Sequence, residues 1–123
     1  MSFNKVILLG NLTRDPEQKE LPSGMKVASF GLAVNDRWTD KNGDKREEVC
    51  FLDVDVFGRQ GEVIMQYFTK GKAILAEGKL KFRSWEDDEG NKRSKHSLMM
   101  DRFSFVGGRD PAQEIDTDDD IPF

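Results

Sequence analysis

The sequence has little of the chemistry on which disulfide-rich, metal-binding and membrane-spanning proteins depend. It contains one cysteine and one histidine, which excludes an internal disulfide framework and a Cys/His zinc cluster. No apolar run approaches the roughly 18 residues of a membrane span. The apolar stretch at residues 6–9 is shorter than the about 7–15 residues of a signal-peptide core. We therefore expect a cytoplasmic protein with no membrane partner.

Acidic and basic residues are unevenly distributed. Six of the 23 acidic residues and none of the 19 basic residues lie in 110–123. This tail has a charge of −6 and residues 1–109 have +2, although the whole chain has −4. The tail also lacks periodic apolar positions, so we expect it to be disordered. We predict one folded domain over 1–107 and an acidic linker and tip over 108–123.

The apolar pattern predicts a small β-barrel. Aliphatic composition or alternation predicts five strands, which are 6–12, 27–34, 49–57, 72–85 and 95–106. Residues 61–68 instead carry one apolar stripe of a short helix, with Gly71 as its C-terminal cap. We see no internal repeat. This order predicts an all-β OB-fold, a five-stranded Greek-key barrel with one short helix between strands 3 and 4.

Alternation also assigns side chains to faces. In 49–57, Cys50 shares a face with Leu52, which indicates a small core residue and not a nucleophile. Phe51 and Phe57 point the other way. In 72–85, Leu80 and Phe82 lie on the side of Ile74 and Ala76.

The opposite side of 72–85 has the composition of a nucleic-acid surface. Its members, spaced about 6.5 Å apart, are Lys79, Lys81, Arg83 and Trp85. Single-stranded nucleic acid offers phosphates to cations and unstacked bases to a flat ring. The alternative is a solvated edge strand whose lysines discourage aggregation.

Three other aromatic residues extend this pattern. Trp38 follows Arg37, and Phe51 and Phe57 share a face with the carboxylates of Asp53 and Asp55. Because burial of two unpaired carboxylates is costly, we expect that face to be solvated or at a polar interface. Lys45 and Arg46 are further candidates for contact with a nucleic-acid backbone.

Several motifs resemble the bacterial single-stranded DNA-binding proteins. They are Asn4-Lys5-Val6-Ile7-Leu8-Leu9-Gly10-Asn11-Leu12 followed by Asp15-Pro16, then Phe57-Gly58, Lys70-Gly71, Glu77-Gly78-Lys79-Leu80 and the tip Asp118-Asp119-Asp120-Ile121-Pro122-Phe123. The resemblance covers the whole chain, and the tip is its most specific part. The short stretch 107–117 resembles a phage, plasmid or compact-genome version of the family.

The resemblance implies a homotetramer of OB-folds that wraps single-stranded DNA, is nucleoid-associated, and has no cofactor, bound metal or enzymatic activity. It implies base stacking by Trp38, Phe51, Phe57 and Trp85. Phe51 stands where Trp is common in the family. Asp53 and Asp55 also depart from its pattern, which has basic or neutral residues there.

The C-terminal tip has the chemistry of a docking peptide. Pro122 restrains the backbone, Phe123 supplies an apolar anchor with a free carboxylate, and the residues Asp118, Asp119 and Asp120 suit a basic rim. With Ile121, the tip is expected to bind DNA replication and repair enzymes. An acidic solubilising tail is the alternative.

Two other classes of function remain open. One is an OB-fold module that binds RNA or a protein. The other is a Mg²⁺-dependent nuclease with Asp53 and Asp55 as metal ligands, although the sequence supplies no third ligand or general base. His96, in the last strand, is expected to pack or to face solvent.

Overall fold

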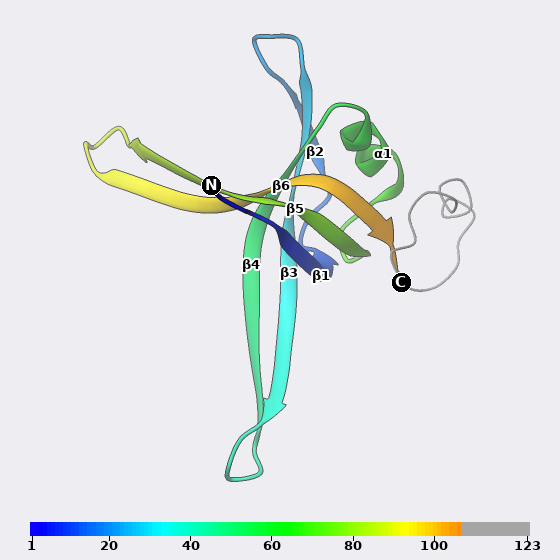
Figure 1. Cartoon of the computed structure of the whole chain (residues 1–123), viewed down its shortest axis with the longest axis vertical. Helices are drawn as coiled ribbons and strands as arrows, with labels where there is room; N and C mark the ends of the chain where they lie inside the picture. Colours follow the sequence, from blue (N-terminus) through cyan, green and yellow to red (C-terminus); the bar gives the residue numbers. More distant parts are fainter. Residues whose placement is uncertain (107–123) are drawn as a thin grey trace.

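The computed structural model describes residues 1–106, which form a small barrel with two long hairpins. The elements are β1 (Val6–Leu12), β2 (Glu17–Glu20), β3 (Lys26–Thr39), β4 (Lys45–Phe57), α1 (Arg59–Tyr67), β5 (Ala73–Glu86) and β6 (Lys92–Phe105). The hairpins β3–β4 and β5–β6 extend from the barrel in different directions (Figure 1). We call residues 35–49 the first arm and residues 82–96 the second arm. Residues 107–123, with the predicted tail and tip, lie outside the described residues.

Strand β1 closes the barrel because it pairs with β5 on one side and with β3 on the other. It runs antiparallel to β5 and, at Asn11 and Leu12, antiparallel to β3. Between these two neighbours the sheet continues through β6 and β4, which pair in parallel. Five strands therefore return to their start, and α1 stands between the third and fourth of them. This arrangement confirms the predicted OB-fold.

Strand β2 is the one element that the sequence does not predict. In the sequence it lies between the first and second barrel strands, and in the sheet it pairs with β3. All four of its residues, Glu-Gln-Lys-Glu, are polar and exposed, so it has no apolar alternation from which a strand could be predicted.

The barrel core follows the predicted apolar faces. Its largest fully buried side chains are Phe30, Phe68, Leu32, Ile64, Ile74, Leu98, Val54 and Val56. Ile64 and Phe68 belong to the predicted helical stripe and join α1 to the core. Phe68, and not Gly71, caps the helix. Gly71 adopts a φ of 91° in the following turn, where its N–H donates to the Leu12 carbonyl at 2.8 Å.

Burial stops where the arms leave the barrel. Cys50 is exposed, so its predicted place in the core is wrong. Leu80 and Phe82 are exposed as well, although they continue the side of the buried Ile74 and Ala76. Alternation identifies the face of a strand correctly, but both faces meet water once the hairpin extends past the barrel. Within residues 1–106, no helix has the length and apolar character of a membrane span.

Candidate nucleic-acid interface

Basic side chains of two neighbouring strands share one face of the sheet. Lys79, Lys81 and Arg83 alternate along β5 and so point the same way. The β6 residues opposite Lys81 and Arg83 are Ser97 and Lys95. Because directly opposite residues of an antiparallel pair share a face, Lys95 joins the predicted row as a fourth basic residue.

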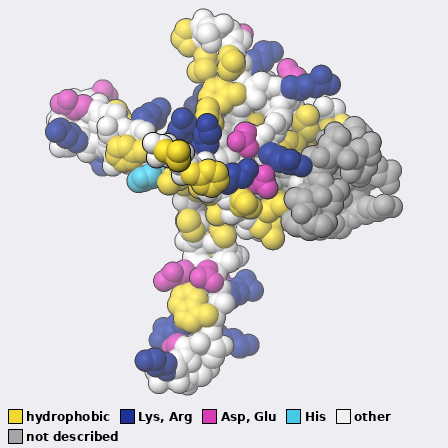
Figure 2. All heavy atoms as spheres, viewed as in Figure 1, with side chains coloured by type: hydrophobic (Ala, Val, Ile, Leu, Met, Phe, Trp, Pro, Cys, Tyr) yellow, Lys and Arg dark blue, Asp and Glu magenta, His cyan; other side chains and the backbone are white. Residues whose placement is uncertain are grey.

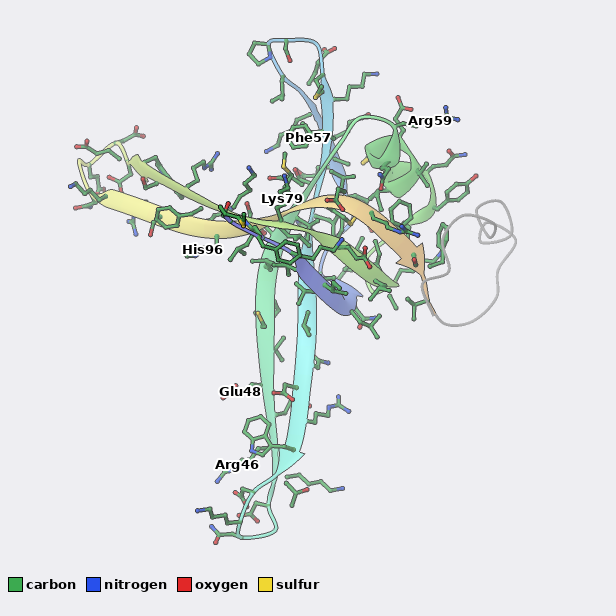
Figure 3. All side chains as sticks on the ribbon, in the orientation of Figure 1. Arg46, Glu48, Phe57, Arg59, Lys79 and His96 are labelled. Carbon is green, nitrogen blue, oxygen red and sulfur yellow. The ribbon has the colours of Figure 1, made fainter. Side chains whose placement is uncertain are left out.

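This row borders a hollow of about 450 Å³ on the barrel surface. Basic and acidic side chains lie together near the crossing of the hairpins (Figure 2), where Lys79 and Phe57 are also found (Figure 3). The charged lining of the hollow consists of Arg14, Lys19, Lys81, Arg83, Lys95, Asp53 and Asp55, and its rings are Phe57 and Phe82. Five basic groups against two carboxylates leave the hollow net positive, which suits a phosphate backbone.

The two carboxylates in the hollow are held by neighbouring groups. Asp53 forms ion pairs with Lys95 and, at 3.6 Å, with Arg14. The hydrogen bond from Lys95 is the main cause that lowers the pKa of Asp53, and Arg14 adds to it against the opposing effect of burial. Asp55 accepts a hydrogen bond of 2.7 Å from the Ser29 hydroxyl. The predicted polar character of this face is therefore present, with both carboxylates engaged.

Gly31 creates the space through which Arg14 reaches Asp53. It is the β3 residue directly opposite Asp53. A Cβ atom at Gly31 would overlap the hydroxyl of Thr13 and lie 2.7 Å from a terminal nitrogen of Arg14. A larger residue would therefore displace Arg14 from the edge of the hollow.

The four predicted stacking residues are spread over both arms and the barrel surface. Trp38 is on the first arm and Trp85 is on the second arm, with 42% and 40% of their surfaces exposed. Phe51, at the base of the first arm, is 69% exposed. Phe57 is half-buried and lines the hollow. Neither indole is sealed inside the barrel, so both remain available to a base.

The predicted basic residues differ in the groups that they contact. Arg83 lies over the Trp85 ring, with its guanidinium carbon 5.0 Å from the ring centroid. Arg37 instead donates through Nε to the Glu47 carboxylate at 2.7 Å. This ion pair offsets the charge that Arg37 would offer to a phosphate. Lys45 and Arg46 lie with Trp38 around a shallow pocket on the first arm.

Four residues of this surface escape the sequence analysis. Arg14 and Lys19 come from the β1–β2 loop and from β2, and only the folded chain brings them to the hollow. Lys95 could be found by pairing the last two strands across their turn. Phe82 escapes because alternation places it on the side of the core, whereas it is exposed and packs on His96, with ring centroids 5.0 Å apart.

A family model matches almost all of the described chain. Residues 3–106 match the model of the Single-strand binding protein family. The chain belongs to this family. The resemblance inferred from the sequence motifs is thereby confirmed.

Other members of the Single-strand binding protein family are similar over most of this chain. A "Single-stranded DNA-binding protein" of Wolinella succinogenes is 47% identical over 111 residues, which are 90% of this chain and 68% of that protein. One of Helicobacter hepaticus is 46% identical over 112 residues, which are 91% of this chain and 66% of that protein. The alignments thus span about two thirds of the length of these relatives.

Two solved structures of proteins that bind single-stranded DNA by name share the fold. A Plasmodium falciparum SSB in complex with ssDNA superimposes with a TM-score of 0.80 at 26% identity, covering 87% of this chain and 97% of that one. A deletion mutant of the single-stranded DNA binding protein from Thermus aquaticus gives a TM-score of 0.74 at 34% identity, covering 87% and 52%.

Proposed function

We propose that this protein binds and protects single-stranded DNA, without sequence preference, during replication, recombination and repair. The observation that carries the proposal is the exposure of both indoles on arms that leave the barrel beside a net positive hollow. Relatives that are named single-stranded DNA-binding proteins, and a neighbour solved with ssDNA, support it. The proposal includes a cytoplasmic location in association with the nucleoid.

Binding in this proposal combines stacking with phosphate contacts. Stacking contributes about 1–3 kcal/mol per base and tolerates any sequence, because every base has a π-face. Each neutralised phosphate adds about −0.7 to the slope of log affinity against log salt. The proposed DNA-binding residues are Trp38, Phe51, Phe57, Trp85, Arg37, Lys79, Lys81 and Arg83, to which the hollow adds Arg14, Lys19 and Lys95. Arg37 contributes least because Glu47 pairs with it.

Competition between nucleic acids tests this function. Fluorescence anisotropy of labelled oligo-dT reports its binding, with poly-dT, poly-rU or duplex DNA as competitor. We expect poly-dT to compete best and duplex DNA worst, because only unpaired bases can stack. Equal or stronger competition by poly-rU would favour the alternative of an RNA-binding OB-fold module. Failure of every nucleic acid to bind would leave the alternative of a protein-binding module.

The nuclease alternative finds little support in the hollow. The two carboxylates that it needs, Asp53 and Asp55, are engaged by Lys95, Arg14 and Ser29. Across residues 1–106, no group of three or more His, Cys, Asp or Glu side chains is placed to hold a metal ion. Single strands incubated with the protein and Mg²⁺ are expected to stay intact, and cleavage would restore the alternative.

The homotetramer belongs to the same proposal. Phe3, Ile7 and Leu9, at and just before β1, are large apolar residues exposed in the single chain. Exposed apolar surface of this kind is typical of an interface, and a second copy of β1 is the proposed occupant. The molar mass measured by light scattering should correspond to four chains for the wild-type protein and to fewer chains for Leu9→Asp. A monomeric wild-type protein would contradict the proposal.

The C-terminal tip is proposed to recruit DNA replication and repair enzymes. The residues concerned, Asp118, Asp119, Asp120, Ile121, Pro122 and Phe123, lie outside the described residues, so the proposal rests on their chemistry. Deletion of Phe123 should abolish capture of such enzymes while oligo-dT affinity stays nearly unchanged. If capture survives the deletion, the tip is an acidic solubilising tail.

A further inference from the structure

A nine-residue pattern occurs twice in the chain, once at the end of each arm. Residues 38–46 read WTDKNGDKR and residues 85–93 read WEDDEGNKR. The copies share Trp, Asp, Gly, Lys and Arg at the same spacing. The prediction that the sequence has no internal repeat is therefore wrong at this scale. The repeat is difficult to recognise in the sequence because each copy has only nine residues and spans a turn between two strands.

The two copies fold into the same turn. In the first, one carboxylate oxygen of Asp40 accepts from the backbone N–H groups of Asn42 and Asp44 at 2.9 and 3.0 Å. In the second, one oxygen of Asp87 accepts from those of Glu89 and Asn91 at 3.0 and 2.9 Å. The shared glycine adopts a φ of 82° in one copy and 83° in the other, a conformation that favours glycine.

The second carboxylate oxygen of each Asp holds the Arg at the end of the pattern. Arg46 Nε donates to Asp40 at 2.9 Å, and Arg93 Nε donates to Asp87 at 3.0 Å. Each bond uses one of the five N–H donors of the guanidinium. The two Arg side chains are 58% and 59% exposed, so each guanidinium is fixed in position and still open to solvent.

Each Arg stands directly across from the Trp of its own copy. Trp38 pairs with Arg46, and Trp85 pairs with Arg93. Residues that pair directly in an antiparallel hairpin project from the same face. An exposed indole and a fixed guanidinium therefore lie side by side at the end of each arm. The arm ends are the free ends of the two hairpins in Figure 1, and Figure 3 labels Arg46.

We propose that the two arm ends are two copies of one nucleotide-binding unit, in which the indole stacks on a base and Arg46 or Arg93 binds the adjacent phosphate. The inference rests on the proposed binding of single-stranded DNA. Asp40 and Asp87 are positioning residues in this unit. Each ion pair offsets part of the charge of its Arg, as Glu47 does for Arg37. Asp40 and Asp87 are themselves held by two backbone N–H groups each, so they also fix the guanidinium before DNA arrives, which reduces the entropy lost on binding.

Replacement of Asp40 or Asp87 distinguishes their proposed positioning of the Arg from simple repulsion between a carboxylate and DNA. Asp40→Asn and Asp87→Asn each remove a negative charge, which by itself should tighten binding to DNA. Asn keeps an oxygen for the two backbone N–H groups, but its NH₂ group cannot accept from the Arg. We therefore expect about threefold to tenfold weaker oligo-dT binding at about 0.05–0.2 M salt, the effect of losing one phosphate contact. The salt slope should become shallower by about 0.7 in each variant.

Matched controls lie in the same two turns. Asp44→Asn and Asp88→Asn also remove one negative charge each, from carboxylates to which the turn assigns no backbone or Arg contact. They should bind oligo-dT as tightly as the wild-type chain or more tightly. Arg46→Gln and Arg93→Gln should reproduce the shallower slope directly, and they keep the test valid if an Asn variant disturbs its turn.

The outcomes also distinguish this inference from the proposed function. If the wild-type chain binds oligo-dT, but the Asn variants behave like their controls and the Gln variants keep the wild-type slope, the repeated unit is refuted while the function stands. If the wild-type chain does not bind single strands, the function itself fails and the inference fails with it. A loss confined to one arm would refute the claim that the two units are equivalent.

Discussion

The two arms end in the same turn but have stems of opposite charge. The first stem, residues 35–37 and 47–49, is net negative, and the second stem, residues 82–84 and 94–96, is net positive. Two residues before each Trp, the first arm has Asp36 opposite Glu48, and the second has Arg83 opposite Lys95. Like charges directly opposite each other destabilise a hairpin, so neither stem is optimised for its own stability. A polyanion would relieve the repulsion in the second arm and increase it in the first. On the proposed function, we expect the shared end unit to bind DNA on both arms and the second stem to supply most of the affinity.

The largest expected difference between the arms concerns the two indoles. Trp85→Ala should weaken oligo-dT binding towards the upper part of the range of about 1–3 kcal/mol for a stacked base, and Trp38→Ala towards the lower part. Arg83 lies over the Trp85 ring and loses that support in the variant, whereas the equivalent neighbour of Trp38 is the acidic Asp36. Titration of each variant with labelled oligo-dT measures the two losses.

Conservative variants serve as controls for the indoles. Trp38→Phe and Trp85→Phe keep an aromatic face and should recover part of each loss. Equal losses for the two Ala variants would contradict the inequality of the arms, and no loss in either would remove stacking from the proposed function.

Removal of two residues of the basic row on β5 should produce the next largest effect. Lys81→Ala with Arg83→Ala removes two phosphate contacts, so the salt slope should become shallower by about 1.4 and affinity should fall about tenfold at about 0.2 M salt. Arg37→Ala on the first arm is the matched control and should change the slope by less than about 0.7. Its guanidinium is already paired with Glu47 at 2.7 Å. Equal changes in slope per basic residue would show that the ion pair does not matter.

Neutralising the acidic stem tests whether its negative charge opposes DNA binding by the first arm. Asp36→Asn with Glu48→Gln removes the like-charge pair of the first arm. The free energy of unfolding should rise by about 0.2–1 kcal/mol. Oligo-dT affinity should increase by a few-fold at low salt, because DNA meets less negative charge on the first arm. Calorimetry and fluorescence titration measure the two effects. Unchanged or weaker DNA binding would mean that DNA does not approach the first stem.

The barrel could be predicted from the sequence because its strands alternate over a buried face. Strand β1 has the predicted bounds, and Phe30 and Ile64 lie in the core as their spacing requires. The arms could not be predicted to the same depth. Cys50 and Phe82 continue the alternation beyond the barrel, where no core exists to bury them. Alternation records which side a residue faces and not how far the barrel extends.

Much of the candidate interface depends on contacts between segments that are distant in sequence. The row on β5 could be predicted because it lies on one strand. Arg14 meets Asp53 only because β3 and β4 pair with Gly31 opposite Asp53, a register that depends on the whole hairpin. The residues repeated at the two arm ends are visible in the sequence, but the hydrogen bonds that make the two turns equivalent are seen only in the folded chain.

The smallest expected difference concerns the two positioning carboxylates. The pKa of Asp40 is lowered chiefly by the hydrogen bond from Arg46, whereas the pKa of Asp87 is lowered chiefly by the backbone N–H of Asn91, with Arg93 second. Arg46→Gln should therefore remove the leading cause of the lowered pKa of Asp40, whereas Arg93→Gln leaves the leading cause at Asp87 in place. Carboxyl carbon shifts followed by NMR through an acid titration of the full chain measure both values.

The sign of the pH dependence follows from the lowered pKa values. The ionised carboxylates stabilise the arm ends at pH values above the usual carboxyl range, and this stabilisation is lost as the pH falls through the lowered pKa of each Asp. The amide signals of Gly43 and Gly90 should report the opening of the two turns. In Arg46→Gln the first turn should open at a higher pH than in the wild-type chain, with a smaller change for the second turn in Arg93→Gln. Equal changes would show that Arg46 and Arg93 contribute alike, and that the arms differ in their stems alone.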